Sequence, residues 1–535
     1  MPPPLLWWIK GYMKPITSDE MRTLEAFAVK LGISARILME IAGMKVANIA
    51  VHEIKRAGSA CVICGSGGNG GDGFVTARYL HNAGIRTDVF VTSKEADISS
   101  QEAIDNLKIL KGLGIKVIGL SSAGTLDDLK ISIISSDIVI DAIYGIGFKG
   151  EVKDIASSII DLINKTKNEI KDKRRYSVLS IDVPSGADAS TGAVASKCVE
   201  ADITVTFEYP KLGLLKYPAS KFAGKVITTS IGIPRPNPVE PQARIHAETE
   251  MPAKGKLEGL QVTDPMFVAS VIPKRKVDSN KGDFGKVLVI AGSSGMMGAA
   301  VLTANAALRT GSGLVTLCVP DKIKDIVNSM SLETVIAGFS ELDEKLKDCD
   351  VIALGPGLSR SKDAVKLVRS LILSKRIKVP MVIDADGLNA ISDTSILKRS
   401  GKDIILTPHP GEFSRLSGRK VEEIQRDRAG NAGRFASKYG VTIVLKGAYT
   451  VIAGKGKTYI NPTGNPGMSS AGVGDVLTGI IASLIGQGVE PFKAAVAGTY
   501  VHGTAGNLAV SIKGEHGTIA SDIIDSIPYT LASIL

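Results

Sequence analysis

The sequence has few cysteines and few aromatic residues, and it contains no long hydrophobic run. Its five cysteines are an odd number spread thinly over 535 residues, which argues against a disulfide framework and fits a reducing compartment. No apolar stretch reaches 18 residues, so we expect no transmembrane segment. The short apolar start of the chain lacks the basic residues and cleavage site of a signal peptide. We therefore expect a cytoplasmic globular protein that binds no membrane.

The chain also lacks a basic region suited to nucleic acid. Its formal net charge is +10, but the lysines and arginines are scattered, and no basic stretch is interleaved with aromatic residues that would stack on bases. The densest cluster, Lys171–Tyr176, is typical of a solvated loop. We expect no nucleic-acid partner, and anionic metabolites remain compatible with the charge.

The only Cys-x-x-Cys pair lies within an apolar segment. Cys61 and Cys64 flank two apolar residues in the stretch "ACVIC", just before a glycine loop, where alternate side chains face opposite sides of a strand. No second such pair is nearby, so buried strand cysteines are a better interpretation than a metal or redox site.

The length and the hydrophobic periodicity predict two α/β domains in tandem. A chain of 535 residues exceeds the size at which one core stops growing. Apolar strand candidates alternate with helical patterns in two series, which is typical of parallel sheets covered by helices on both faces, in three layers. A proline-rich stretch without periodicity separates the series. We predict an N-terminal domain over residues 14–235, a linker over 236–262 and a C-terminal domain over 263–535, with Ser18 as an early helix cap.

Ligands of open parallel sheets bind at the carboxyl ends of the strands, so the loops there matter most. In the first domain, the stretch "GSGGNGGDG" satisfies the Gly-x-Gly-x-x-Gly pattern of dinucleotide binding, but neither Asp88 nor Glu95 is well placed as the acidic ribose partner. Asn69 and Asp72 within this loop fit either a tight turn or contacts with a ribose or a hard cation.

Two further acidic residues follow apolar strands of the first domain. Asp141 ends the stretch "IVID", and Asp182 precedes Ser185 in "SIDVPSG". An acid at such a position is poorly solvated unless it caps a loop, binds a cation or transfers protons.

In this order and at these intervals, "GSGGNGGDG", "DAIYGIGFKGE" and "SIDVPSG" resemble the NAD(P)H-hydrate epimerase domain over about 220 residues. The resemblance implies a Rossmann-like fold, a potassium ion bound by Asn69, Asp141 and Ser185, and Asp182 as the acid/base residue beside the hydrated ring. Gly68 departs from the family, which usually has Asn there. The residues implied to bind the hydrated dinucleotide are Gly68, Asn69, Gly70, Gly71, Asp72, Gly145, Ile146, Gly147, Phe148, Lys149, Gly150, Glu151 and Asp182.

In the second domain, the stretch "AGVGDVLTG" places Asp475 between glycines at the start of an apolar helical pattern. A helix start and glycines form an anion-binding site, so the carboxylate of Asp475 is either a helix cap or a base that acts beside a phosphate. No Gly-x-x-x-x-Gly-Lys-Ser/Thr motif occurs in the chain, which excludes a Walker-type nucleotide site.

Seven motifs of the second domain, in order, resemble the ADP-dependent NAD(P)H-hydrate dehydratase of the ribokinase-like superfamily over about 260 residues. They are "GDFGKVLVIAGSSGMMGAA", "AALRTGSGLVT", "GPGL", "DADGLNA", "TPHPGE", "KGAYT" and "GNPGMSSAGVGDVLTGIIA". The resemblance implies ADP as co-substrate, with Mg²⁺ bridging its phosphates, and Asp475 as the base. It places Ala300, Gly357, His409 and Asp475 at the hydrated cofactor, and Lys446, Gly447, Ala448, Tyr449, Thr450 and Gly474 at the nucleotide.

Taken together, the two resemblances predict a bifunctional repair enzyme for hydrated NADH and NADPH. The first domain would interconvert the R and S hydrates, and the second would dehydrate the S form with ADP, giving AMP and phosphate. The alternatives are a small-molecule kinase of ribokinase-like fold with a non-catalytic ligand-binding N-terminal domain, and a binding module, because folds like the first domain occur in mRNA-decapping scaffolds. We expect a homo-oligomer whose subunit number the sequence does not define.

Overall fold

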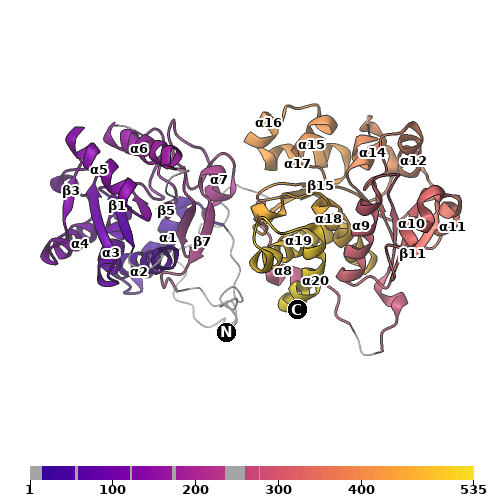
Figure 1. The fold of residues 1–535 in the computed structure, drawn as a ribbon, viewed down its shortest axis with the longest axis horizontal. Helices are drawn as coiled ribbons and strands as arrows, with labels where there is room; N and C mark the ends of the chain where they lie inside the picture. The colour runs from indigo at the N-terminus through magenta and orange to yellow at the C-terminus, as the bar shows by residue number, and fades with distance from the viewer. Residues whose placement is uncertain are drawn as a thin grey trace. The chain divides into compact units, whose positions relative to one another are not determined.

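The chain forms two compact units, one containing the described residues up to 234 and the other those from 260 onward. The computed structural model describes residues 15–54, 58–120, 123–152, 154–170, 176–234, 260–275, 278–391 and 393–535. The basic cluster 171–175 and most of the predicted linker lie outside these ranges. Both units alternate strands with helices (Figure 1), so the predicted α/β class is confirmed.

The N-terminal unit is a seven-stranded parallel sheet with the order β3-β2-β1-β4-β5-β6-β7. The order reverses between β1 and β4, and a crevice for a ligand forms outside the carboxyl ends of strands at such a point. The strands are β1 (Ser59–Cys64), β2 (Arg86–Val91), β3 (Val117–Gly119), β4 (Ile138–Ala142), β5 (Ser177–Ile181), β6 (Ile203–Phe207) and β7 (Lys225–Thr229).

Helices cover this sheet, and the short segment before the first helix pairs with a distant part of the chain. Ile16 forms an isolated parallel bridge with Lys211 just before the first helix, whose cap is Thr17 and not the predicted Ser18. Thr17 and Glu20 form a reciprocal capping box there. The helices are α1 (Ser18–Lys30), α2 (Ala35–Glu53), α3 (Gly68–Asn82), α4 (Gln101–Gly112), α5 (Ala123–Ser135), α6 (Asp154–Ile170) and α7 (Ala219–Phe222).

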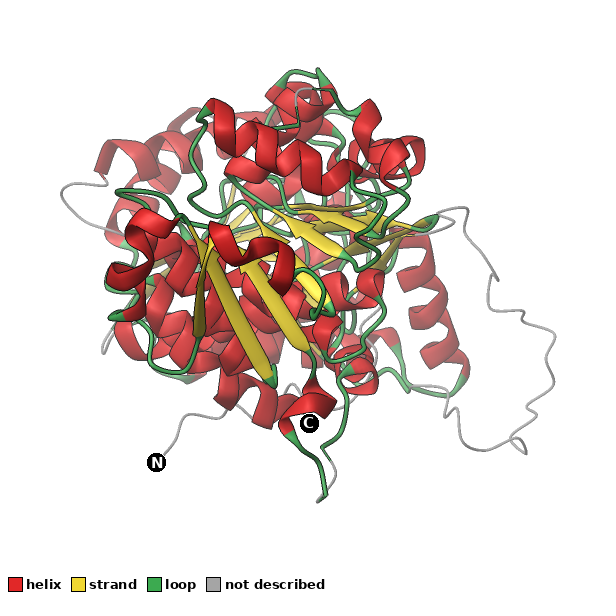
Figure 2. Ribbon diagram, turned by 90° about the vertical axis from the view of Figure 1, so that its right-hand side faces the viewer, coloured by secondary structure: helices red, strands yellow, loops and turns green. Residues whose placement is uncertain are grey.

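The C-terminal unit contains a ten-stranded sheet with the order β11-β10-β9-β12-β13-β14-β15-β16-β17-β8. Helices lie on both sides of the strands (Figure 2), as the sequence predicted. The strands are β8 (Leu260–Val262), β9 (Lys286–Ile290), β10 (Leu314–Val319), β11 (Val335–Gly338), β12 (Val351–Leu354), β13 (Met381–Ile383), β14 (Ile404–Leu406), β15 (Thr442–Leu445), β16 (Val451–Gly454) and β17 (Lys457–Ile460).

Two features of this sheet differ from the sequence prediction. The sequence predicted a parallel sheet, but the stretch "VTIVLKGAYTVIA" forms two antiparallel strands, β15 and β16, and β17 continues the antiparallel order. The loop "KGAYT" therefore turns the chain between β15 and β16. The predicted linker end is also wrong, because Leu260–Val262 pairs in parallel with β17 and belongs to the second sheet.

The helices of the C-terminal unit vary widely in length, and the longest lie near its C-terminus. In the described ranges no helix is both long and apolar enough to span a membrane. The helices are α8 (Pro265–Val271), α9 (Met297–Thr310), α10 (Lys324–Asn328), α11 (Leu342–Lys345), α12 (Lys362–Leu373), α13 (Asp386–Asn389), α14 (Ser395–Ser400), α15 (Pro410–Ser417), α16 (Val421–Arg426), α17 (Arg428–Tyr439), α18 (Val473–Gly486), α19 (Pro491–Lys513) and α20 (Ala520–Ile534).

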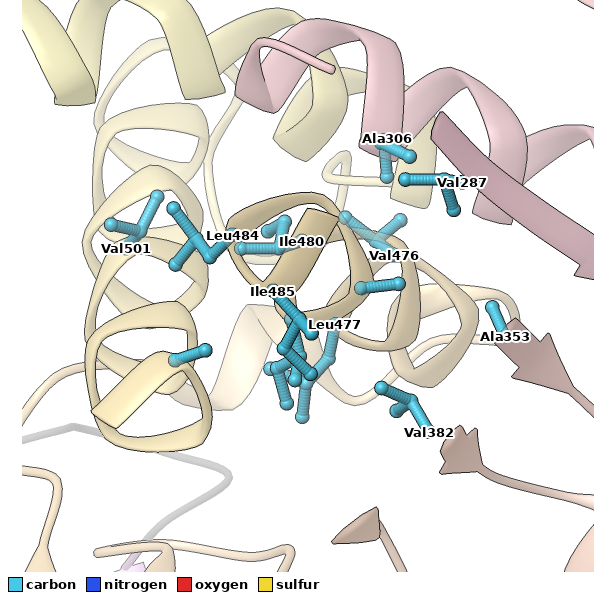
Figure 3. Packing of buried hydrophobic residues seen from close by; sticks show 14 of the residues in the cluster. Val287, Ala306, Ala353, Val382, Val476, Leu477, Ile480, Leu484, Ile485 and Val501 are labelled. Carbon is cyan, nitrogen blue, oxygen red and sulfur yellow. The ribbon is translucent and has the colours of Figure 1, made fainter. Parts of the chain in front are cut away.

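Helix α18 is the central helix of the C-terminal core. It is apolar on nearly every side, as expected of a helix that neighbours surround completely, and almost all of its residues are buried. Figure 3 shows its side chains between Ala306 of α9, Val501 of α19 and Val382 of β13. Gly479 allows the closest approach, since a Cβ there would lie 2.2 Å from the Thr303 carbonyl oxygen. This packing fixes the first turn of α18, which carries Asp475.

Candidate active sites

The glycine loop of the N-terminal unit runs directly into helix α3. Gly67 caps the helix without a side-chain hydrogen bond, so Asn69 is the second helical residue. The Asn69 side chain lies against the loop after β4, because a Cβ on Gly145 would be 3.1 Å from the Asn69 Cγ atom. Within the described residues the Asn69 Nδ2 atom is buried without a hydrogen-bond partner. The fold thus brings the loops after β1 and β4 together at the point where the strand order reverses.

Asp141 and Ser185 form one buried hydrogen-bonded group. The Ser185 hydroxyl donates to Asp141 Oδ1 at 2.5 Å, and the Ser185 backbone N–H donates to Oδ2 at 2.9 Å. Ser180 also donates to Oδ2, at 2.7 Å. Burial raises the pKa of Asp141, and these hydrogen bonds act in the opposite direction. The ends of β4 and β5 are therefore in direct contact.

Asp182 lies on the same edge of the sheet in a strained conformation. Its φ angle is +65°. Residues other than glycine rarely adopt this backbone conformation, and those that do are often found at functional sites. Its Oδ1 atom pairs with the ammonium of Lys211 at 2.8 Å and accepts a hydrogen bond from Thr206 at 3.1 Å. Lys211 is fully buried. A buried charge is retained only when it is paired, so this ion pair fixes the Asp182 carboxylate.

The predicted dinucleotide-binding residues divide into exposed and buried groups. Gly68, Gly147, Lys149, Gly150 and Glu151 are exposed, and Asn69, Asp72, Gly145, Ile146 and Phe148 are half-buried. Gly70 and Gly71 are buried. A Cβ on Gly70 would lie 2.0 Å from the Gly65 carbonyl oxygen, and a Cβ on Gly71 would lie 2.5 Å from the Met39 side chain. These two glycines serve close packing in the structure, and their contact with a ligand stays a prediction.

Asp475 is not the cap of helix α18, so the cap interpretation is wrong. Gly472, with φ +86°, caps the helix without a side-chain hydrogen bond, and Asp475 is the third helical residue. Burial and the nearby Asp384 carboxylate raise the pKa of Asp475 to about 7, while the Lys446 ammonium acts in the opposite direction. A carboxyl group with a pKa near neutrality is suited to general acid or base chemistry.

Lys446 links the end of β15 to two acidic side chains. Its ammonium lies 2.7 Å from Asp384 Oδ1 and 4.0 Å from Glu412 Oε2, and a Cβ on Gly474 would be 3.2 Å from it. Burial acts to lower the pKa of Lys446, but Asp384 and Glu412 raise it overall. Asp384 also accepts a hydrogen bond from Thr478 of α18 at 2.9 Å. The predicted nucleotide residues Lys446 and Gly474 thus lie close together beside Asp475.

The remainder of the "KGAYT" loop is shaped by unusual backbone angles and by an arginine behind it. Gly447 has φ +143° and Tyr449 has φ +54°. The Arg428 guanidinium of α17 donates to the Leu445 and Lys446 carbonyls at 2.7 and 3.1 Å. Gly447 and Ala448 are exposed, and Tyr449 and Thr450 are half-buried. The loop therefore presents its backbone to solvent next to Lys446.

The three other residues predicted to contact the hydrated cofactor differ in their exposure. His409 is exposed and caps α15, where its Nδ1 atom accepts hydrogen bonds from Gly411 and Glu412. Gly357 is buried, and a Cβ on it would lie 2.6 Å from the Met296 carbonyl oxygen. Ala300 is fully buried beneath Gly292, so the structure gives its side chain no surface for a ligand. The roles of these three residues stay predictions.

Sequence reasoning missed several residues that the fold places at the sites. Asp384 is 1% exposed and binds both Lys446 and α18. His502 of α19 is buried, and its Nε2 atom lies 3.0 Å from the carbonyl oxygen of Val473 in the first turn of α18. Burial lowers the pKa of His502 to about 4, so the ring is neutral and donates this hydrogen bond. Asp384 stands in a quoted motif and could have been found, whereas no local pattern marks His502.

Comparisons with known proteins agree with this geometry. Residues 35–213 match the family model described as YjeF-related protein N-terminus, and residues 287–529 match the model described as NAD(P)H-hydrate dehydratase. Two curated proteins named bifunctional NAD(P)H-hydrate repair enzyme are similar over nearly the whole chain. The relative from Moorella thermoacetica is 39% identical over 97% of both chains, and that from Thermofilum pendens is 34% identical over 98% of this chain and 97% of its own.

Among solved structures, the ADP/ATP-dependent NAD(P)H-hydrate dehydratase from Bacillus subtilis is 30% identical. It covers 52% of this chain and 100% of its own, with a TM-score of 0.48. The two family matches define the protein as a tandem of a YjeF-related N-terminal unit and an NAD(P)H-hydrate dehydratase unit. It belongs to the family of bifunctional NAD(P)H-hydrate repair enzymes, which confirms the resemblance predicted from the motifs.

Proposed function

We propose that the two units divide the repair of hydrated NADH and NADPH between them. The N-terminal unit is the epimerase that interconverts the R and S hydrates, and the C-terminal unit is the dehydratase that returns the S hydrate to NAD(P)H. We assign the epimerase to residues 14–235 and the dehydratase to residues from 260 onward. The protein acts in the cytoplasm as a homo-oligomer, with the hydrates and a nucleotide as its ligands.

In the epimerase, Asp182 is the proton-transfer residue beside the hydrated ring. Inversion at C6 requires the C6–O bond to break, the carbon to become planar and water to add from the other face. The departing oxygen needs a proton and the arriving water must lose one, so positioned acid and base groups lower these barriers. The strained backbone of Asp182 and its ion pair with Lys211 support this role, because both restrict the orientation of the carboxylate.

We propose a potassium site at Asn69, Asp141 and Ser185. The donor set contains only amide, carboxylate and hydroxyl oxygens, which suit a hard cation. Asp141 and Ser185 are in contact. The Asn69 side chain lies against the neighbouring loop that contains Gly145, and in the described structure its amide nitrogen is buried without a hydrogen-bond partner. When bound, the ion would supply positive charge next to the ligand, and Asp141 would orient Ser185.

In the dehydratase, Asp475 is the base that removes the proton from the C6 hydroxyl. The hydroxyl oxygen then attacks the terminal phosphorus of the nucleotide. Phosphate leaves afterward as a better leaving group than hydroxide, and loss of a proton from C5 completes the ring double bond. The backbone N–H groups at the start of α18 and the Lys446 ammonium stabilise negative charge on the phosphoryl group. ADP would give AMP and phosphate. The nucleotide contacts are those of the "KGAYT" loop and Gly474.

We propose that Mg²⁺ accompanies the nucleotide. Mg²⁺ is commonly held by substrate phosphates with one or two carboxylates. No group of three or more His, Cys, Asp or Glu side chains suited to a metal occurs in the described ranges, which agrees with an ion that arrives on the phosphates. Its chemistry would be neutralisation of phosphate charge.

The observation that carries the dehydratase proposal is Asp475 itself, with a pKa of about 7 beside Lys446 in the first turn of α18. The test is to incubate the protein with hydrated NADH and either ADP or ATP, and to follow the return of the reduced-nicotinamide absorbance. Recovery with a nucleotide supports the proposal, and no recovery with either contradicts it. A small-molecule kinase with a silent N-terminal unit would consume nucleotide without restoring absorbance, and a binding module would do neither.

A further inference from the structure

Helix α1 lies against the part of the epimerase site that contains Asp182. The Ile16 N–H donates to the Pro210 carbonyl at 3.0 Å, and the Leu212 N–H donates to the Ile16 carbonyl at 2.9 Å. At the helix start, the Ser18 N–H donates to the Ser190 hydroxyl at 2.8 Å. The base of α1 is therefore fixed to the segment that carries Lys211 and to the loop that follows Asp182.

The same helix also reaches the loop after β4. A Cβ placed on Gly147 would lie 3.4 Å from the Arg22 guanidinium, and Gly147 is one of the predicted ligand-binding residues. One turn from Arg22, Glu25 is half-buried and interacts electrostatically with Asp182, Lys211 and Asp72. Helix α1 thus adds a carboxyl group to the site that none of the sequence motifs contains.

Glu25 and Asp182 differ in their environments. The Asp182 carboxylate is paired at 2.8 Å with a fully buried ammonium. Burial and the Asp182 charge raise the pKa of Glu25 to about 7, and Lys211 and Arg22 only partly oppose this shift. Burial, followed by Asp182 and Glu25, also raises the pKa of Asp72 well above its usual range. Two titratable groups whose environments separate their protonation states are typical of an acid and base pair.

We propose that Glu25 is the second proton-transfer residue of the epimerase site, acting with Asp182, and that Lys211 is the positioning residue that holds the Asp182 carboxylate in place. The proposal rests on the epimerase function proposed above. Protonated Glu25 gives its proton to the C6 hydroxyl as the C6–O bond breaks, and water departs. A water molecule then forms a new C6–O bond on the other face and gives a proton to Asp182.

The proton count of the pair is unchanged by this step. Glu25 has lost one proton and Asp182 has gained one, while the substrate has exchanged one water for another. The pair is then set for the reverse epimerisation, or it returns to its first state by proton exchange with solvent. Two groups are required because the oxygen leaves from one face of the ring and arrives at the other.

The test measures conversion of the R hydrate to the S hydrate by the full chain without nucleotide, using chromatographic separation of the epimers over pH 5 to 9. We expect Glu25→Gln to lower kcat at least about 100-fold, the usual contribution of general acid catalysis, with little change in KM. The ionisation near pH 7 should disappear from its profile. Asp19→Asn is the matched control, because Asp19 is an acidic residue of the same helix whose side chain is 77% exposed.

Lys211→Met tests the positioning role. Removal of the cation should move the acidic limb of the profile, where the base Asp182 is protonated, to higher pH, which a purely structural defect would not do. If Glu25→Gln keeps the wild-type kcat, or loses rate with the shape of the profile unchanged, the inference is wrong. If Asp72→Asn removes the ionisation near pH 7 instead, the second group is Asp72 and not Glu25. An active Asp182→Asn variant would contradict the epimerase proposal itself, so the two failures can be told apart.

Discussion

At the scale of single residues, the opposite environments of Asp475 and Asp182 define the two chemistries. Asp475 lies at the start of a helix among other carboxylates, which favours its neutral form, whereas Asp182 is paired with a buried lysine. A base that takes the proton from a hydroxyl must itself be deprotonated, and a carboxyl group with a pKa near 7 is in large part deprotonated at physiological pH.

We expect Asp475→Asn to abolish dehydration, with a loss of at least about 1000-fold in kcat, because the asparagine amide cannot accept the hydroxyl proton. The side chain is nearly isosteric and caps nothing, so nucleotide binding and the fold should be retained. The rate of NADH recovery and nucleotide affinity by calorimetry are the measurements. Epimerisation should stay at the wild-type rate, and its loss together with dehydration would point to a general folding defect.

The pH dependence of dehydration follows from the same residue. A base acts only when it is deprotonated, so the rate should be low at pH 5.5 and should rise through a midpoint near the Asp475 pKa of about 7. Bound nucleotide adds negative charge and should move the midpoint of kcat above that of kcat/KM. Initial rates at saturating and limiting nucleotide measure the two profiles. A rate that falls as the pH rises through 7 would instead make the essential group an acid.

At the scale of elements, helices α18 and α9 pack closely against each other in the C-terminal core. A Cβ on Gly479 would lie 2.2 Å from the Thr303 carbonyl oxygen and 2.8 Å from the Ala306 Cβ. We expect Gly479→Ala to separate the helices and to lower the free energy of unfolding by about 1 to 3 kcal/mol, measured by urea denaturation. Gly298→Ala is the matched control, because Gly298 is exposed on α9 with nothing within 4 Å of its Cβ position. An equal loss in both variants would contradict the packing argument.

Much of each element could be predicted from local patterns, because strand and helix periodicities and glycine loops are properties of neighbouring residues. The ends of β1, β4 and β5 followed from these patterns, and so did the start of α18. The hairpin of β15 and β16 did not, since "KGAYT" separates two apolar runs too briefly to mark two strands. His502, Lys211 and Glu25 were missed because their roles depend on contacts between distant segments, as in the hydrogen bond of His502 to Val473.

At the scale of the whole molecule, the two activities lie in separate compact units. When a mixture of the two epimers is supplied with nucleotide, we expect the Asp182→Asn variant to restore NADH only from the S hydrate that is present at the start. Slow spontaneous epimerisation would add to this amount. The wild type should recover both forms. The end-point absorbance measures this partition.

An equimolar mixture of Asp182→Asn and Asp475→Asn chains provides the control. Each chain then has one working unit, and full recovery of the mixture shows that the hydrate passes through solution. Recovery of the R form by Asp182→Asn alone would place epimerisation elsewhere in the chain.

Strand β8 has a consequence for any attempt to separate the units. Leu260–Val262 directly follows the inter-unit segment and forms the edge strand beside β17. A fragment that begins at residue 263 would therefore leave the backbone groups of β17 without their neighbour, and an open strand edge invites pairing with another chain. A dehydratase fragment that begins at the end of the predicted linker would therefore expose an unpaired strand edge that promotes association. A soluble fragment must retain Leu260–Val262.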